Sequence, residues 1–341
     1  SWLAWEDRAI RLHKPKAVDK YMKELSNEVD YYSFIQFLFY KQFRAFKSYL
    51  KSIDIKLIGD LPLYVSMDSS DVWANSKVFQ LNYNHKPKRV SGVPPDHFSS
   101  TGQLWGNPLY NWKKQKSDNY SWWLKRIESN LNLFDVIRID HFRGLNSYWS
   151  VPYGETNAIN GCWKKGPDKD FIDAVNMNFP NAKIIAEDLG LLTEGVNELL
   201  KYSGYPGMRI LQYGFDKKEE DYHLPHRYIK NCVCYTGTHD NMAIGEWVKE
   251  ADINSLNYAK SYLGLTAKEG YHMGFIRGGM SSSADLFIAQ MQDYLGLSSN
   301  CRMNVPGTWE NNWKWRLLKG ELTDELSDNI LAYTDLYDRN R

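Results

Sequence analysis

The segment FDVIRID (Phe134–Asp140) is a short apolar run that ends in an acid. Three other segments have a similar form: Ile55–Asp60, Ala182–Asp188, and Cys232–Gly237 with Asp240 just beyond it. Short apolar runs that are rich in β-branched residues favour buried strands. Helical patterns separate these runs, and strands that alternate with helices predict a parallel α/β architecture.

The remaining elements follow from hydrophobic spacing and turn residues. Segment 61–112 is rich in Pro, Gly, Asn and aromatic residues, and we expect a functional loop region or a small subdomain there. A further strand is predicted over 208–212, and helices are predicted over 31–51, 117–132, 169–176, 193–202, 243–263 and 283–295.

Composition excludes several classes of protein. The 341 residues include 42 basic and 41 acidic ones, which is not the charge balance of a nucleic-acid or anionic-membrane binder. The longest apolar candidate, Phe34–Tyr40, is far shorter than the ~18 residues of a spanning helix. The N-terminus has neither the basic nor the apolar region of a secretory leader. We therefore expect neither nucleic acid nor membrane as a partner.

The four cysteines, at positions 162, 232, 234 and 301, lack the spacing of a zinc or redox site. We expect buried free thiols, a reducing and therefore cytoplasmic location, no metal and no cofactor. Aromatic residues make up 15% of the chain, and sugars stack their C–H faces on aromatic rings. Carbohydrate is therefore a candidate ligand.

Acidic residues stand at or near the ends of four predicted strands: Asp60, Asp140, Glu187 and Asp240. A single acid in such a place is often a helix cap or a turn residue. Four of them, flanked by histidines and arginines, favour a catalytic interpretation, because barrel enzymes carry catalytic groups at the carboxyl ends of their strands. Two carboxyl groups about 5–5.5 Å apart suit retaining glycoside chemistry. Burial and repulsion would keep one of them protonated, but spacing in the sequence assigns no roles.

Several segments resemble the signature segments of 4-α-glucanotransferase (amylomaltase, or disproportionating enzyme), a family of the α-amylase clan. The resemblance covers nearly the whole chain, and it implies a TIM (β/α)8 barrel that transfers α-1,4-glucan segments between maltooligosaccharide donors and acceptors. The segments are Gly59–Val65, Ser91–Phe98, Thr101–Tyr110, Arg138–Gly144, Ala186–Gly190, Gly237–Asn241, Arg302–Thr308 and Asn312–Arg316.

The resemblance also implies roles for individual residues. Asp140 would be the nucleophile of a double displacement, Glu187 the general acid and then the general base, and Asp240 the acid that stabilises the transition state. Trp105 would stack on a sugar ring, whereas we expect Tyr64 to pack rather than to touch substrate. The substrate-binding set implied by the resemblance is Arg138, His141, His239, Asp60, Asp96, Gln103, Trp105 and Asn304.

We expect one catalytic barrel over residues 1–341, with an inserted subdomain over 61–133 and a second insertion over 145–180. Segment 157–166 of that insertion would cover the cleft as a lid, with Gly161 and Gly166 as hinges. The resemblance implies further sequence before Trp2, so we expect the barrel here to lack its N-terminal strands. A hydrolase of the same clan and a non-catalytic glycan-binding protein remain as alternatives.

Overall fold

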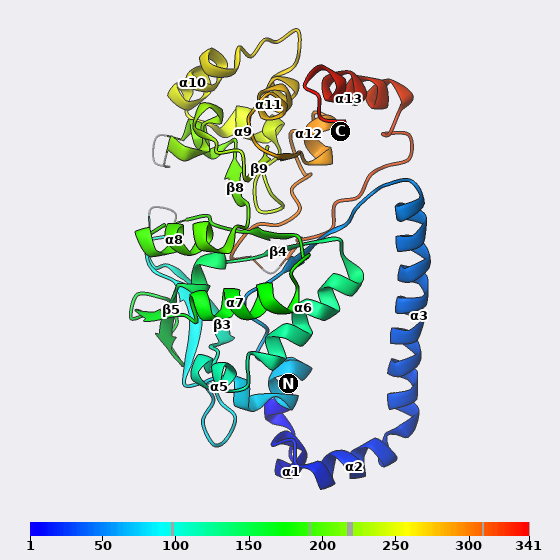
Figure 1. The fold of residues 1–341 in the computed structure, drawn as a ribbon, viewed down its shortest axis with the longest axis vertical. Helices are drawn as coiled ribbons and strands as arrows, with labels where there is room; N and C mark the ends of the chain where they lie inside the picture. Colours follow the sequence, from blue (N-terminus) through cyan, green and yellow to red (C-terminus); the bar gives the residue numbers. More distant parts are fainter. Residues whose placement is uncertain (97–98, 191, 217–220, 309, 341) are drawn as a thin grey trace. The chain divides into compact units, whose positions relative to one another are not determined.

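In the computed structural model, the structure describes residues 1–96, 99–190, 192–216, 221–308 and 310–340. The chain divides into two units, Ser1–Tyr205 and Pro206–Arg341. In Figure 1 the sequence colours run from blue to green through the first unit and on to red through the second.

A parallel three-stranded sheet organises the first unit. Its strands are β1 (Ile58–Leu61), β4 (Val136–Ile139) and β7 (Ile184–Ala186), in the order β1-β4-β7. Their carboxyl ends lie at one edge of the sheet, because all three strands run in the same direction. The register places Asp60 opposite Arg138, and it places residue 139 between Leu61 and Ala186.

Helices pack against this sheet and against one another. Helix α6 contacts both β1 and β4, and α7 lies between α6 and α8 (Figure 1). Trp123 of α6 and Phe171 of α7 are among the largest fully buried side chains of the core. The helices of the unit are α1 (Arg8–Arg11), α2 (Pro15–Glu24), α3 (Ser26–Ser52), α4 (Ser70–Ala74), α5 (Trp112–Ser117), α6 (Ser121–Leu133), α7 (Lys169–Asn178) and α8 (Glu194–Ser203), with 3₁₀ turns η1 (Trp2–Ala4), η2 (Ser76–Val78) and η3 (Phe142–Leu145).

The two regions predicted as insertions supply a second, antiparallel sheet. Its strands are β2 (Arg89–Val93), β3 (Gln103–Pro108), β5 (Ser147–Pro152) and β6 (Cys162–Lys165), in the order β3-β2-β5-β6. Segment 61–112, expected to be irregular, therefore contains two of the strands as well as α4 and η2.

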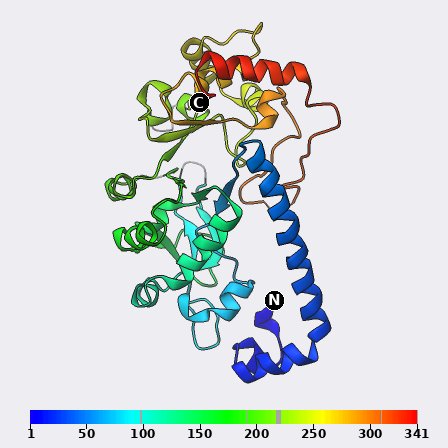
Figure 2. The same cartoon turned by 45° about the vertical axis from the view of Figure 1, so that its right-hand side comes forward.

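Helix α3 is the longest helix that the structure describes, and it contains the predicted helix over 31–51. Leu50 is its buried residue, while most of its large apolar side chains, such as Phe34, Phe37 and Tyr49, are exposed. Figure 2 shows α3 as a straight rod that continues from α2. None of the described helices is both long enough and apolar enough to cross a bilayer.

The second unit has its own parallel sheet, in the order β10-β9-β8. A cluster that includes Phe215, Phe275 and Ile244 forms the larger part of its core. The elements are β8 (Gly207–Ile210), β9 (Cys232–Tyr235), β10 (Leu286–Ile288), α9 (Ile244–Glu250), α10 (Ile253–Leu263), α11 (Tyr271–Met280), α12 (Met291–Tyr294) and α13 (Asp324–Leu336), with 3₁₀ turns η4 (Tyr213–Phe215), η5 (Asp221–His223) and η6 (Pro225–Arg227).

The predicted helix over 283–295 is wrong. Leu286–Ile288 forms strand β10, which pairs with β9, and only Met291–Tyr294 is helical in that range. Phe287 packs against the cluster that contains Cys232 and Cys234, so sheet pairing and burial outweigh the helical spacing. The four cysteines are free thiols; Cys232, Cys234 and Cys301 are buried as expected, whereas Cys162 is partly exposed.

The helix predicted over 117–132 is α6, which begins at Ser121, after Asn119 and Tyr120 in the left-handed conformation. The helix predicted over 243–263 is divided into α9 and α10, and the Asp252 carboxylate caps the start of α10. The mixed α/β class is confirmed. The described parallel strands form two three-stranded sheets, so closure into a barrel remains a prediction.

Candidate active site

The carboxyl edge of the first unit's parallel sheet gathers three acids around one arginine. Arg138 Nη1 donates to Asp60 Oδ1 at 2.5 Å and to Asp140 Oδ1 at 3.1 Å. Burial alone would lower the pKa of Arg138, but the charges of Asp140, Glu187 and Asp60 raise it, so the guanidinium stays charged. The Arg138 side chain is largely buried, whereas both aspartate side chains are 41% exposed. The two aspartates are therefore accessible from solvent.

Glu187 lies directly after β7 and has a different environment. Its side chain is buried, and this burial, reinforced by the nearby charge of Asp140, raises the pKa of Glu187 well above the usual glutamate range. The backbone N–H groups of His141 and Leu189 donate to its two carboxyl oxygens, at 2.6 and 2.9 Å. The result is a fixed carboxyl group whose raised pKa favours its protonated form beside a second carboxyl group, the pattern typical of a general acid.

His141 connects these acids to an aromatic cluster. Its ring meets the Trp105 ring edge-on at 4.8 Å, and the Tyr64 ring lies 6.2 Å away. Burial, with a smaller effect of Arg143, lowers the pKa of His141 to about 3, so the imidazole is neutral. Its Nε2 is buried and has no hydrogen-bond partner within the described residues. A buried polar atom without a partner commonly marks a functional position.

Two other predicted contacts come from the antiparallel sheet region. Gln103 lies in β3, and its Oε1 accepts a hydrogen bond from Trp105 Nε1 at 3.2 Å. Asp96 accepts from Ser99 N at 2.8 Å and so closes a turn. His97 and Phe98, the last residues of the quoted motif Ser91–Phe98, lie outside the described residues.

The second unit holds the remaining predicted residues: His239 and Asp240 follow β9, and Asn304 follows α12. Asn304 Nδ2 donates to Asp240 Oδ1 at 2.6 Å, and Asn304 N donates to His239 O at 3.0 Å. His239 Nε2 lies 3.5 Å from Asp240 Oδ2, and the Trp313 ring lies 5.0 Å from the His239 ring. Asn304, predicted as a glucan contact, therefore contacts Asp240 directly.

The structure brings the predicted residues together in two groups. One group, in the first unit, contains Asp60, Arg138, Asp140, Glu187, His141, Gln103 and Trp105. The other, in the second unit, contains His239, Asp240 and Asn304.

Sequence reasoning missed three residues that support these groups. Arg302 donates to the Asp240 carbonyl and, at 3.0 Å, to the Asn304 carbonyl. Arg302 lies in the motif Arg302–Thr308, so the resemblance to the family could have indicated a role at the site. Arg143 stacks on Trp163, and its charge interacts with Glu187. Asp293 is fully buried and hydrogen-bonds Thr236 and Ile244, on either side of Asp240, but nothing in its sequence context indicated this.

The glycines expected to act as lid hinges pack closely against their neighbours. A Cβ at Gly161 would lie 2.1 Å from the Trp149 ring, and one at Gly166 would lie 2.1 Å from the Leu145 carbonyl oxygen. Both positions therefore require glycine for close packing. Among the residues that the structure describes, no cluster of three or more His, Cys, Asp and Glu side chains is arranged to hold a metal ion.

Comparisons with known proteins identify the family. A family model described as 4-alpha-glucanotransferase matches residues 1–322. A 4-alpha-glucanotransferase from Clostridium butyricum is 45% identical over 341 residues, which cover 99% of this chain and 70% of the relative. One from Synechocystis is 43% identical, over 99% of this chain and 67% of the relative.

A solved structure, the amylomaltase from Streptococcus agalactiae in complex with acarbose, superimposes with a TM-score of 0.96 at 35% identity. The match covers 99% of this chain and 68% of that one. The amylomaltase from Corynebacterium glutamicum, at 19% identity and a TM-score of 0.71, shares the fold over 89% of this chain and 49% of its own. The chain therefore belongs to the 4-alpha-glucanotransferase family.

Proposed function

We propose that this chain cleaves an α-1,4-glucan and passes the released segment to a hydroxyl of a second glucan, through a covalent glucosyl-enzyme on Asp140. The family assignment supports transfer between glucans. The observation that carries the mechanism is the environment of Glu187, whose buried carboxyl group retains its proton beside Asp140 and Arg138.

In the first step, an Asp140 carboxylate oxygen attacks the anomeric carbon as the glycosidic bond breaks. Glu187 transfers its proton to the departing glycosidic oxygen, which leaves as a sugar hydroxyl. The hydrogen bond from Arg138 stabilises the carboxylate form of Asp140 before the attack. The same arginine holds Asp60, so Asp60 helps to fix the position of the guanidinium.

In the second step, Glu187 is ionised and accepts the proton of the acceptor hydroxyl. The acceptor oxygen attacks the anomeric carbon, the bond to Asp140 breaks, and the configuration of the original linkage is retained. Two inversions at one carbon account for the retention. The Glu187 carboxyl group can serve both steps because its two backbone hydrogen bonds keep it in place throughout.

The remaining predicted residues have supporting roles in this proposal. Asp240, positioned by Asn304 and Arg302, stabilises the distorted sugar at the transition state. His141 and His239 contact sugar hydroxyls; the buried Nε2 of His141 supports such a contact. Trp105, with Gln103 and Tyr64 nearby, forms an aromatic and polar wall for the glucan, and Asp96 is a further glucan contact. The acarbose complex of the Streptococcus agalactiae relative supports an oligosaccharide ligand.

This proposal includes the expected architecture. It is a TIM (β/α)8 barrel, a fold that carries its catalytic groups at the carboxyl ends of its strands, with 61–133 and 145–180 as insertions. The segment over 157–166 would limit the access of water to the glucosyl-enzyme. Shortening 160–165 should then raise the ratio of hydrolysis to transfer, and an unchanged ratio would remove the lid from the proposal. The cytoplasmic location stays a prediction.

Incubation with maltotriose tests the proposed reaction. Transfer yields glucose together with a ladder of oligomers longer than the substrate, whereas hydrolysis yields only shorter products. Asp140→Asn provides the control, because it removes the nucleophile without changing the size of the side chain. We expect the ladder from the unchanged chain and a loss of orders of magnitude in the variant, with glucan binding retained. Shorter products alone would favour the hydrolase, and a fully active variant would remove Asp140 from its role.

A further inference from the structure

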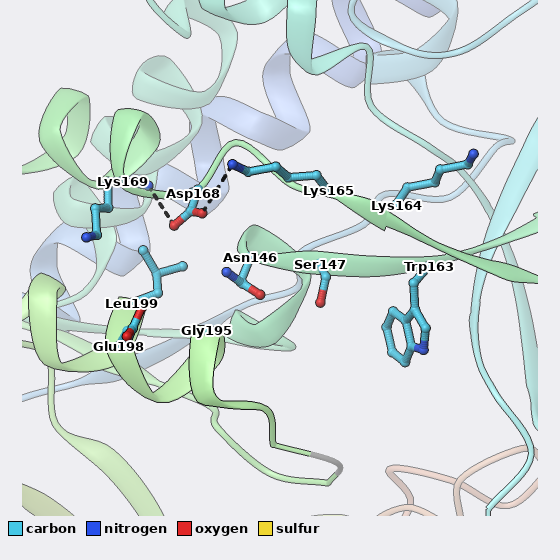
Figure 3. A pocket seen from close by; sticks show the side chains of 10 residues that line it. All are labelled: Asn146, Ser147, Trp163, Lys164, Lys165, Asp168, Lys169, Gly195, Glu198 and Leu199. Carbon is cyan, nitrogen blue, oxygen red and sulfur yellow. Dashed lines mark hydrogen bonds and ion pairs between the residues drawn. The ribbon is translucent and has the colours of Figure 1, made fainter.

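A hollow of about 500 Å³ in the first unit is lined by none of the residues to which the mechanism above gives a contact with the sugar or with the reacting atoms. It is lined by the start of β5, by β6, and by the first turns of α7 and α8. Figure 3 shows Asn146 and Ser147 between the α8 residues on one side and the Trp163 ring on the other.

The hollow borders the segments that leave the candidate active site. Asn146 and Ser147 follow β4, Asp140 and η3, and α8 follows β7 and Glu187. Arg143 joins the two places: its guanidinium lies 4.1 Å from the centre of the Trp163 ring, and its charge interacts with Glu187. A ligand in the hollow would therefore lie close to the acids without touching them.

Trp163 presents a fixed aromatic surface to the hollow. Its backbone pairs with Trp149 across β5 and β6, and the two rings meet edge-on at 5.1 Å. With Arg143 stacked on it, the side chain is still 41% exposed. A rigid, partly exposed indole loses little conformational freedom on binding and offers a flat face to a pyranose ring.

Polar groups with unused hydrogen-bonding capacity surround this ring. The Asn146 side-chain amide has no hydrogen-bond partner within the described residues, although its backbone N–H and carbonyl are both bonded. Ser147 Oγ accepts from Arg143 Nη2 at 3.4 Å, so its own hydrogen can be donated to a ligand. An amide, a hydroxyl and the Glu198 carboxylate offer both donors and acceptors, which suits a neutral ligand with many hydroxyl groups.

The charges around the hollow disfavour an anion. Lys164, Lys165 and Lys169 line it, but so do Asp168 and Glu198, and Lys165 lies 4.0 Å from Asp168. Acidic and basic groups therefore nearly balance. An anion site would need a surplus of donors, whereas a mixed lining around an aromatic ring is typical of sugar recognition.

We propose that this hollow is an outer glucan-binding subsite, in which Trp163 stacks on a glucose unit remote from the cleaved linkage and Asn146 and Ser147 bind its hydroxyls. The inference rests on the proposed function, because the ligand is the same α-glucan. It predicts that long glucans gain affinity from the hollow.

Binding is measured in the Asp140→Asn background, so that the glucan is not consumed. The measurement is the retardation of the protein in a native gel that contains amylopectin. The Asp140→Asn protein is compared with three double variants, which carry Trp163→Ala, Asn146→Ala or Tyr153→Ala in addition. Tyr153 is an exposed aromatic residue outside the hollow and is the matched control. We expect Trp163→Ala to weaken retardation at least about fivefold, Asn146→Ala to weaken it less, and Tyr153→Ala to leave it unchanged. Asn146→Ala leaves the aromatic pair intact and keeps the test valid if Trp163→Ala fails to fold.

Retardation that persists in both hollow variants would overturn the inference. A second result would also overturn the inference. If excess inorganic phosphate weakens the retardation of the Asp140→Asn protein as much as the hollow variants do, the hollow is an anion site. The maltotriose ladder of the unchanged chain reports separately on the proposed function. A chain that makes the ladder but shows no effect of the hollow variants leaves transfer intact and removes only the subsite.

Discussion

Asp293 bridges the two ends of the segment that carries His239 and Asp240, and its buried carboxyl group should make folding stability depend on pH. Its Oδ2 accepts from Thr236 Oγ1, and its Oδ1 accepts from Ile244 N, both at 2.6 Å. Burial raises the pKa of Asp293 from 3.8 to about 6, although these two hydrogen bonds act in the opposite direction.

The sign follows from proton binding. Between 3.8 and about 6 the folded chain keeps a proton on Asp293 that the unfolded chain has lost. The stabilisation from this group is therefore complete below the ordinary aspartate pKa and is lost as the pH rises through about 6. The difference between the two pKa values corresponds to about 3 kcal/mol in the free energy of unfolding.

Thermal unfolding at about pH 4 and about pH 7 tests this assignment with an Asp293→Asn variant. The variant cannot titrate at this position, so it lacks the stabilisation that the unchanged chain loses as the pH rises. The melting temperature of the unchanged chain relative to that of the variant should therefore be several degrees higher at about pH 4 than at about pH 7. Asp285→Asn is the control, because Asp285 is half-exposed and lies 3.9 Å from Lys230. If Asp293→Asn retains the full pH dependence of the unchanged chain, then Asp293 does not titrate in this range and the reasoning is refuted.

Three further predictions concern the acids. Asn304→Ala removes the donor to Asp240, so kcat for maltotriose disproportionation should fall about a hundredfold with little change in melting temperature; an unchanged kcat would make Asn304 dispensable. When kcat is plotted against pH, the loss of activity at high pH should have an apparent pKa well above the usual glutamate pKa, because Glu187 must keep its proton in the first step. An alkaline loss of activity with an apparent pKa near 4.5 would contradict this. Arg138→Met removes a cation that lowers the pKa of Glu187, so the alkaline loss of the variant's remaining activity should move to higher pH. An alkaline loss of activity at the same pH would show that the charge of Arg138 does not affect the pKa of Glu187.

Much of the first unit could be predicted from sequence, because its signals are local. The strands that contain Ile58, Ile137 and Ile185 are short apolar runs between helical patterns, and each ends close to an acid. Since parallel strands place their carboxyl ends at one edge, the clustering of Asp60, Arg138 and Asp140 follows from the pattern itself.

The misses depend on contacts between distant residues. The predicted helix over 283–295 fails because Phe287 is recruited into a sheet and into the cluster around Cys234. The bonds from Asn304 and Arg302 to Asp240 span more than sixty positions of sequence, and a spacing rule does not detect them. The stacking of Arg143 on Trp163 likewise joins two segments that the sequence analysis treated separately.

The most direct test of the mechanism is to trap the glucosyl-enzyme. In Glu187→Gln the general base is absent, so a maltosyl fluoride donor, whose leaving group needs no proton, should react once and remain attached. Mass spectrometry of the digested protein then locates the sugar. We expect one added maltosyl group, on the peptide that contains Asp140. A maltosyl group on another residue, or steady turnover by Glu187→Gln with no covalent adduct, would contradict the assignment of Asp140 and Glu187.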